Sequence, residues 1–263
     1  MSVKMIKDDL KRGGSRRGFT LVELSLSLVF ISILSLTIVL MINNAVESYQ
    51  RGVTLNQINT VGMDLVDDIR TAVQNSSPEN EAGNILPARK GEVNGIDGEV
   101  PLFGVFCTGT YTYVWNSGYF YPNSRAKGDI EKLSIDGTEV KLAKIEDENA
   151  TVCSKMKENW TTFKGGSIDW LREDGEGNVK EFVELLGDKD NNLALYDLAV
   201  TGPARGSGTA FYSISFILGT TSGGVNINAT NDFCSAPQEG SDFNYCAINK
   251  FNFAAQATGG KSE

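Results

Sequence analysis

The hydrophobic residues follow two successive patterns over the first 77 positions, and together these patterns predict one long helix. Residues 19 to 42 form an almost uninterrupted apolar run, FTLVELSLSLVFISILSLTIVLMI, in which Glu23 is the one ionisable side chain. As a helix, this run would be about 36 Å long, enough to cross the hydrocarbon core of a bilayer. From residue 43 to residue 77 the apolar residues recur every three or four positions, which predicts an amphipathic continuation of the same helix.

The pattern beyond residue 77 predicts a globular, β-rich head from 78 to 253. Its β-rich segments are 102–106, 110–115, 132–145, 167–172, 179–186, 193–200 and 211–219. Asp136-Gly137 and the run 175–177 supply the turns of two hairpins. Consecutive hairpins form an antiparallel sheet, and the amphipathic half of the long helix would cover one face of it, so we expect an α+β fold. Residues 79–101 are expected to form a connecting loop, and 254–263 a flexible tail.

Charge is distributed unevenly between the two ends of the apolar run. Residues 1 to 18 form a polar leader with six Lys and Arg side chains and two Asp side chains. The positive-inside rule places this leader in the cytoplasm and the head outside it, as in a single-pass membrane protein. Removal of the leader, whose net charge is +4, would change the net charge of the chain from −9 to −13. Such a surface argues against broad electrostatic binding of DNA.

Glu23 is the residue that a simple membrane anchor does not explain. A carboxylate within a membrane span costs several kcal/mol unless it is paired, lies at the interface or is protonated. A cut between Gly18 and Phe19 would create an α-amino group one helical turn from Glu23. Between packed helices, that pair would become an intermolecular ion pair that sets the register of an assembly.

Residues 17 to 23, RGFTLVE, together with the apolar run that follows, resemble the class III signal of type IV pilins and type II secretion pseudopilins. The resemblance implies that a prepilin peptidase cuts after Gly18 and N-methylates Phe19. It also implies that Glu23 pairs with the amino terminus of a neighbouring subunit. The implied partners are other pilin subunits, through the N-terminal helix, and the inner-membrane assembly platform. The assembled filament would lie in the periplasm or at the cell surface.

The role within such a filament is narrowed by two features of the chain. The head is large, and no proline occurs between Phe19 and Ser77, where many pilins have one in the membrane half of the helix. These features favour a minor pilin or pseudopilin over the main fibre subunit. One alternative is a singly anchored surface receptor or adhesin that keeps its leader and never polymerises. Another is an anchored extracytoplasmic hydrolase that uses carboxylates alone.

The four cysteines, Cys107, Cys153, Cys234 and Cys246, all lie beyond the membrane segment, and none belongs to a C-x-x-C motif. In an exported domain an even number of cysteines indicates disulfides, and four cysteines allow three pairings. We favour Cys234–Cys246, which closes a short loop, and this choice leaves Cys107–Cys153. The alternative is that some of the four are reduced, buried thiols.

Candidate chemistry in the head is limited by the absence of histidine, which excludes histidine-dependent triads and imidazole metal sites. Asp188, Asp190 and Asn192 alternate as in the opening of a calcium loop. Leu193 and Ala199 then occupy the positions where an EF-hand has glycine and glutamate, so a solvated acidic turn is preferred to a looser calcium site. We therefore expect neither a cofactor nor a catalytic site, and the chain is predicted not to be an enzyme.

Two further groups of residues each allow two interpretations. Ser25, Ser32 and Ser35 fall within one narrow sector of the membrane helix. They either permit close packing between helices or donate hydrogen bonds to their own helix. The aromatic residues between positions 111 and 121 either form an exposed binding surface or fill one face of the sheet.

Overall fold

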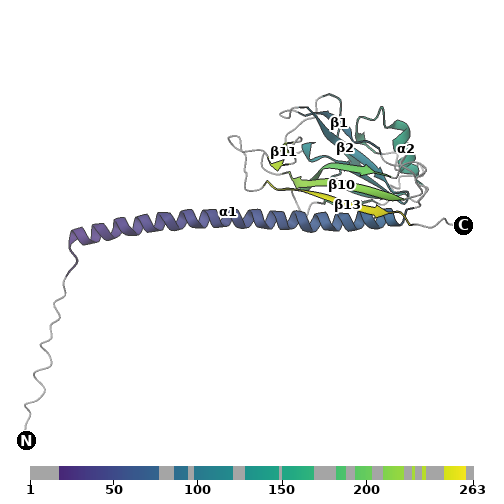
Figure 1. The fold of residues 1–263 in the computed structure, drawn as a ribbon. Helices are drawn as coiled ribbons and strands as arrows, with labels where there is room; N and C mark the ends of the chain where they lie inside the picture. The colour runs from purple at the N-terminus through teal and green to yellow at the C-terminus, as the bar shows by residue number, and fades with distance from the viewer. Residues whose placement is uncertain are drawn as a thin grey trace, which may run out of the picture. The chain divides into compact units, whose positions relative to one another are not determined.

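The computed structural model describes residues 18–76, 86–93, 98–120, 128–147, 150–168, 182–187, 193–202, 210–221, 227–228, 233–234 and 246–258. The chain divides into two compact units, residues 1–48 and 49–263. Helix α1, Leu21–Gln74, is continuous over 54 residues and begins in the first unit (Figure 1). The second unit contains the C-terminal part of α1 and every strand that the structure describes. The predicted single long helix is therefore confirmed, and it ends at Gln74.

Two antiparallel sheets form the centre of the second unit. The larger sheet has the strand order β1-β2-β3-β6-β8, and the smaller has the order β13-β10-β9. A parallel bridge between Ser117 and Leu195 connects them. The strand bounds are β1 Arg89–Glu92, β2 Glu99–Cys107, β3 Tyr111–Asn116, β6 Leu142–Glu146, β8 Phe182–Glu184, β9 Leu193–Thr201, β10 Phe211–Thr220 and β13 Ile248–Gln256. A long helix packed against antiparallel sheets is the α+β fold that the sequence predicts.

The larger sheet is buried on both faces, because α1 covers one face and a second layer covers the other. On β3, Tyr113 and Trp115 belong to the hydrophobic cluster of α1, which also includes Ile58 and Leu65. Val114, between them, belongs to the opposite cluster with Cys153 of the short helix α2, Thr151–Asn159. Successive side chains of a strand point to opposite faces, so this single strand serves both cores. In Figure 1, β10 and β13 run alongside the C-terminal part of α1.

Smaller elements complete the head. The bounds are β4 Leu133–Ile135, β5 Thr138–Glu139, β7 Gly166–Ser167, β11 Ile227–Asn228, β12 Phe233–Cys234 and the 3-10 helix η2 Gly118–Phe120. Asp136 and Gly137 join β4 to β5, and both have positive φ, as a type I′ turn requires. The predicted turn is correct, but the predicted hairpin was too long. The segment that follows it, β6, pairs with β3 instead.

The C-terminal boundary of the head was predicted wrongly. Residues 254–256 were assigned to a flexible tail, whereas they form the end of β13 and pair with β10. Ala255 and Ala257 are buried in the cluster of α1, and the amide of Thr258 donates to the carbonyl of Gln74. The remaining residues of the predicted tail, 259–263, lie outside the described part of the chain.

Three other differences concern local elements. The predicted loop 79–101 contains β1 and the first residues of β2. Helix α2 lies where no helix was predicted. The predicted hairpin over 167–186 is described only at 167–168 and 182–186, where β7 pairs with β4 and β8 pairs with β6 instead of with each other. Its turn at 175–177 lies outside the described residues.

Candidate functional site

The N-terminal end of α1 contains Gly18, Phe19 and Glu23, the three residues that the sequence marks for processing and assembly. Gly18 and Phe19 precede the helix and are exposed. Thr20 and Glu23 form a capping box: Glu23 Oε2 accepts from the backbone amide and the hydroxyl of Thr20, each at 2.9 Å. The amide of Glu23 donates in return to Thr20 Oγ1 at 3.2 Å. Within its own chain, the carboxylate of Glu23 therefore satisfies a donor at the start of the helix.

Thr20 is a participant that the sequence interpretation missed. The signal was available, because Thr-x-x-Glu immediately before an apolar run is the sequence pattern of a capping box. The expected intermolecular partner of Glu23 is not tested by a single chain. The structure shows the contacts of this carboxylate within its own chain.

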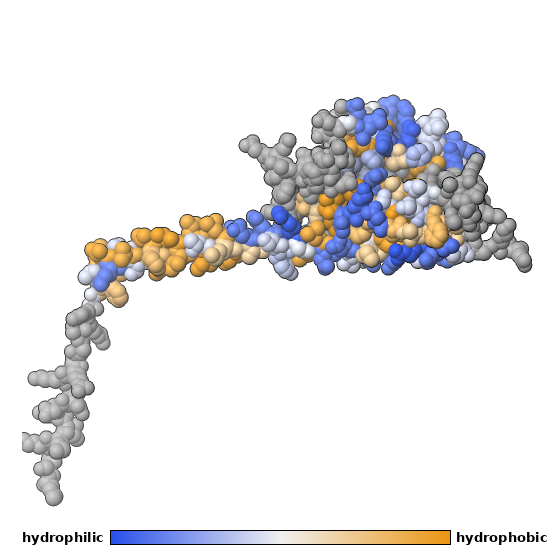
Figure 2. Space-filling model, viewed as in Figure 1, coloured by the Kyte–Doolittle hydropathy of each residue, from blue (hydrophilic) through white to orange (hydrophobic). Residues whose placement is uncertain are grey.

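The apolar side chains that follow Glu23 are exposed on every side of the helix. Leu21 is 85% exposed and Met41 71%, and each large apolar residue between them exposes about half of its surface or more. Figure 2 shows this continuous hydrophobic surface on the first part of α1. Within the described residues, α1 is the one helix long and apolar enough to cross a membrane. An exposed apolar surface of this extent is typical of a segment that meets lipid or another protein.

Two of the three serines in this sector, Ser25 and Ser32, are turned toward their own helix. Ser25 Oγ donates to the carbonyl of Val22, and Ser32 Oγ donates to the carbonyl of Leu28. Their hydroxyl protons are thus satisfied locally, as the second interpretation of these residues proposed. The small side chains still leave room for a neighbouring helix at the same positions.

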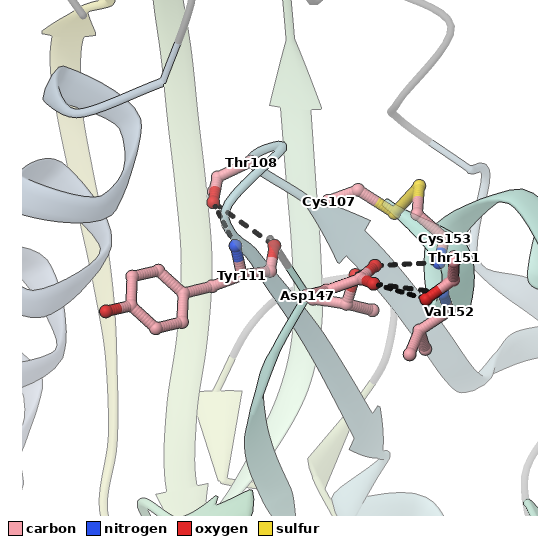
Figure 3. Close-up of a disulfide and its surroundings, with 8 residues drawn as sticks. Cys107, Thr108, Tyr111, Asp147, Thr151, Val152 and Cys153 are labelled. Carbon is pink, nitrogen blue, oxygen red and sulfur yellow. Dashed lines mark hydrogen bonds between the residues drawn. A yellow bond between two sulfur atoms is a disulfide. The ribbon is translucent and has the colours of Figure 1, made fainter. Parts of the chain in front are cut away.

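The disulfide of the head lies between β2 and α2 (Figure 3). Cys107, the last residue of β2, is bonded to Cys153 of α2, with the two Cα atoms 6.0 Å apart. This pairing is the one predicted. Cys246 is also disulfide-bonded. The side chain of its predicted partner, Cys234, lies outside the described residues, so Cys234–Cys246 remains a prediction.

Asp147 lies beside this disulfide and is 1% exposed. Its Oδ2 accepts from the hydroxyl of Thr112 at 2.9 Å and from the amide of Cys153 at 2.9 Å. Its Oδ1 accepts from the amide of Val152 at 3.0 Å and the hydroxyl of Thr151 at 3.3 Å. Asp147 therefore supplies acceptors for the first turn of α2. The sequence interpretation missed this residue because it predicted no helix at 151–159 and because Thr112, the fourth donor, is 35 positions away.

The contact between α1 and the larger sheet includes a polar group of three residues. Lys144 Nζ on β6 lies 2.6 Å from Asp68 Oδ1, and the hydroxyl of Tyr113 donates to Asp68 Oδ2 at 2.8 Å. Burial and, secondarily, the carboxylate of Asp68 raise the pKa of the Tyr113 phenol well above its usual value. Burial likewise raises the pKa of the Tyr196 phenol.

The aromatic cluster fills the sheet and forms no exposed binding surface in the described residues. Tyr113, Trp115, Tyr119 and Phe120 are all buried, and Tyr111 is half-buried beneath the ammonium of Lys144, whose Nζ lies 4.2 Å from the ring centroid. The second interpretation of these residues is therefore correct for the described part of the cluster.

The calcium candidate, Asp188, Asp190 and Asn192, falls outside the described residues. Among the residues that are described, no group of three or more His, Cys, Asp or Glu side chains could hold a metal ion. Comparisons of the chain with protein-family models, curated proteins and solved structures find no match.

Proposed function

We propose that this chain is a subunit of a pilin-like filament. In this proposal the chain is inserted as a prepilin, cut between Gly18 and Phe19, and N-methylated at Phe19. The apolar helices of many subunits then pack side by side. The chain is a building block and a substrate of the peptidase, not a catalyst, and its size favours a minor pilin or a pseudopilin.

One observation carries the proposal: the entire apolar surface between residues 19 and 42 is exposed, and its one ionisable side chain lies at the start of the helix. A helix that is apolar on all sides can be surrounded by lipid before assembly and by neighbouring helices after assembly. A plain anchor would need the apolar surface but not the acid, whose burial in lipid is costly.

The capping box adds a physical role for Thr20. While the subunit is a monomer in the membrane, the two hydrogen bonds from Thr20 partly compensate the carboxylate of Glu23 for its lost hydration. A cut after Gly18 places a positive α-amino group on Phe19, the residue directly before Thr20. The same carboxylate would then be available to a terminus of a neighbouring subunit, since a carboxylate has acceptor sites for more than two donors.

The experiment replaces Glu23 by alanine in the native host and measures the share of the protein that is recovered in sheared filaments. Glu47→Ala is the matched control, because Glu47 is an exposed glutamate on the same helix outside the apolar run. We expect Glu23→Ala to be inserted and cleaved normally but to be lost from filaments, whereas Glu47→Ala is incorporated as the parent chain is. Equal incorporation of both variants would contradict the role given to Glu23.

A further inference from the structure

The Cys107–Cys153 disulfide is paralleled by a chain of hydrogen bonds that passes through Asp147. Thr112 lies directly opposite Cys107 in the pairing of β2 with β3. The hydroxyl of Thr112 and the amide of Cys153 both donate to the same oxygen, Asp147 Oδ2. One carboxylate oxygen thus holds a direct neighbour of the first cysteine and the backbone of the second. Figure 3 shows Asp147 between the strands and the first turn of α2.

Asp147 itself is fixed by the sheet. It follows the last residue of β6, and its amide donates to the carbonyl of Thr110 at 2.8 Å, just before β3 begins. Its own carbonyl accepts from the amide of Ala150 at 2.8 Å, which closes the turn into α2. The position of the carboxylate is therefore determined by strands β3 and β6 and not by the disulfide.

Helix α2, in contrast, depends on Asp147 for its start. The residue at its N-cap, Ala150, has no side chain that can accept a hydrogen bond and adopts a left-handed conformation with φ of 50°. A non-glycine residue in this region is strained, so surrounding contacts must hold it there. The amides of Val152 and Cys153, which an N-cap side chain would normally satisfy, are both bound by Asp147. Without this carboxylate, the first turn of α2 would keep its apolar contacts with β2 but would lose the hydrogen bonds that fix the position of Cys153.

We propose that Asp147 is a positioning residue for disulfide formation, which brings Cys153 to Cys107 before the two are covalently joined. Cys107 and Cys153 are 46 residues apart in sequence, and closing so long a loop at random is unfavourable. Two other cysteines compete as partners in the unfolded chain. By docking the first turn of α2 on the sheet, Asp147 selects one pairing out of three. This inference depends on the folding of the head alone and is independent of filament assembly.

The covalent step is thiol–disulfide exchange with an external disulfide, for which glutathione disulfide serves as the reagent. The thiolate of one cysteine attacks the reagent, forms a mixed disulfide and releases one glutathione thiolate. The thiolate of the other cysteine then attacks the sulfur of the first, forms Cys107–Cys153 and releases the second glutathione. The two protein thiols lose two protons and two electrons, and glutathione disulfide accepts the electrons. Asp147 takes no part in the electron transfer; it sets which protein thiol makes the second attack.

The test uses the full chain, reduced and unfolded in denaturant and then diluted into detergent micelles with a glutathione redox buffer. Free thiols are alkylated at successive times, and the disulfides formed are identified by mass spectrometry of a non-reduced digest. The variants are Asp147→Ala and Thr112→Val, the second of which removes only one of the donors to Asp147. Asp129→Asn is the control for loss of a carboxylate, because Asp129 is 86% exposed in an ion pair with Lys164. Val66→Ala is the control for loss of stability, because Val66 is buried in the cluster of α1.

In the parent chain we expect Cys107–Cys153 to dominate the species with a single disulfide. In Asp147→Ala its share should fall at least about threefold, and in Thr112→Val by a smaller factor, with pairings to Cys234 or Cys246 in its place. Both controls should keep the parental share, although Val66→Ala unfolds more easily. The proposal would be overturned if Cys107–Cys153 made up the same share of the single-disulfide species in Asp147→Ala as in the parent chain. If Asp147→Ala yields no folded protein, Thr112→Val decides: a share of Cys107–Cys153 equal to that of the parent chain would overturn the proposal.

Discussion

Lys144 Nζ lies 2.6 Å from Asp68 Oδ1, so strand β6 is tied to helix α1 by an ion pair within the head. The side chains are 17% and 29% exposed, respectively, and the second oxygen of Asp68 accepts from Tyr113. The three side chains meet where the amphipathic half of α1 crosses the larger sheet. They therefore fix how α1 is rotated about its axis and where it lies along the sheet. Apolar contacts alone would define these two less well.

Replacing Asp68 by alanine should lower the free energy of unfolding of the head by about 2 kcal/mol, because a partly buried ammonium and a buried hydroxyl lose their acceptor. The measurement is denaturant unfolding of the full chain in detergent micelles, followed by the fluorescence of its tryptophans. The adjacent Asp67→Ala is the control, since Asp67 is 70% exposed and pairs only with Arg70 of the same helix in the contacts described. Its effect should stay within about 0.5 kcal/mol. If Asp68→Ala and Asp67→Ala lowered the free energy of unfolding equally, Asp68 would not have the stabilising role given to it here.

The raised pKa values of Tyr113 and Tyr196 predict a loss of stability at alkaline pH. Both phenols stay protonated in the folded head, whereas in the unfolded chain they ionise near pH 10. Above that pH the unfolded state has lost protons that the folded state keeps, so stability falls by about 1.4 kcal/mol per pH unit for each phenol. Below it, these two groups contribute no pH dependence.

The check is the pH dependence of the unfolding free energy between pH 8 and pH 11 for the parent chain and for Tyr113→Phe. The variant should be less stable near pH 8, because it lacks the hydrogen bond to Asp68, and should lose stability less steeply above about pH 10. An alkaline slope equal to that of the parent chain would show that Tyr113 does not resist ionisation.

Two glycines of α1 should respond in opposite ways to alanine. A Cβ atom added at Gly62 would overlap the ring of Phe251 on β13, so Gly62→Ala must displace that ring. We expect a loss of about 1–3 kcal/mol in the same unfolding measurement. At Gly52 nothing lies within 4 Å of the added atom, and alanine is the better helix former there by about 1 kcal/mol. Gly52→Ala should therefore leave the head as stable as before or stabilise it.

The long helix could be predicted because its two apolar patterns extend over many turns. The turn at Asp136-Gly137 could be predicted because both of its residues favour positive φ. The packing around Gly62 has no such local signal in the sequence. In the structure, Gly62 has no side chain at the place that the ring of Phe251 occupies, so packing and not helix preference explains the glycine.

Elements that depend on distant partners could not be predicted in this way. Strand β13 contains Asn, Lys and Ala residues with little preference for strands, and it is ordered by pairing along its whole length with β10. Helix α2 has no capping side chain at its own N-cap, and its first turn is bound by Asp147, which follows β6 and in turn accepts from Thr112 on the distant strand β3. For the candidate site, the roles of Gly18, Phe19 and Glu23 are inferred from sequence alone and stay predictions. The capping role of Thr20 was readable as well, from its spacing to Glu23.

The most direct measurement is the amino terminus of the mature protein isolated from its native host, determined by intact mass and by sequencing of the N-terminal peptide. The account predicts a chain that begins with N-methylated Phe19 and lacks residues 1 to 18. A mature chain that still begins at Met1 would contradict it, because Glu23 would then have no terminal amine beside it and no role in joining subunits.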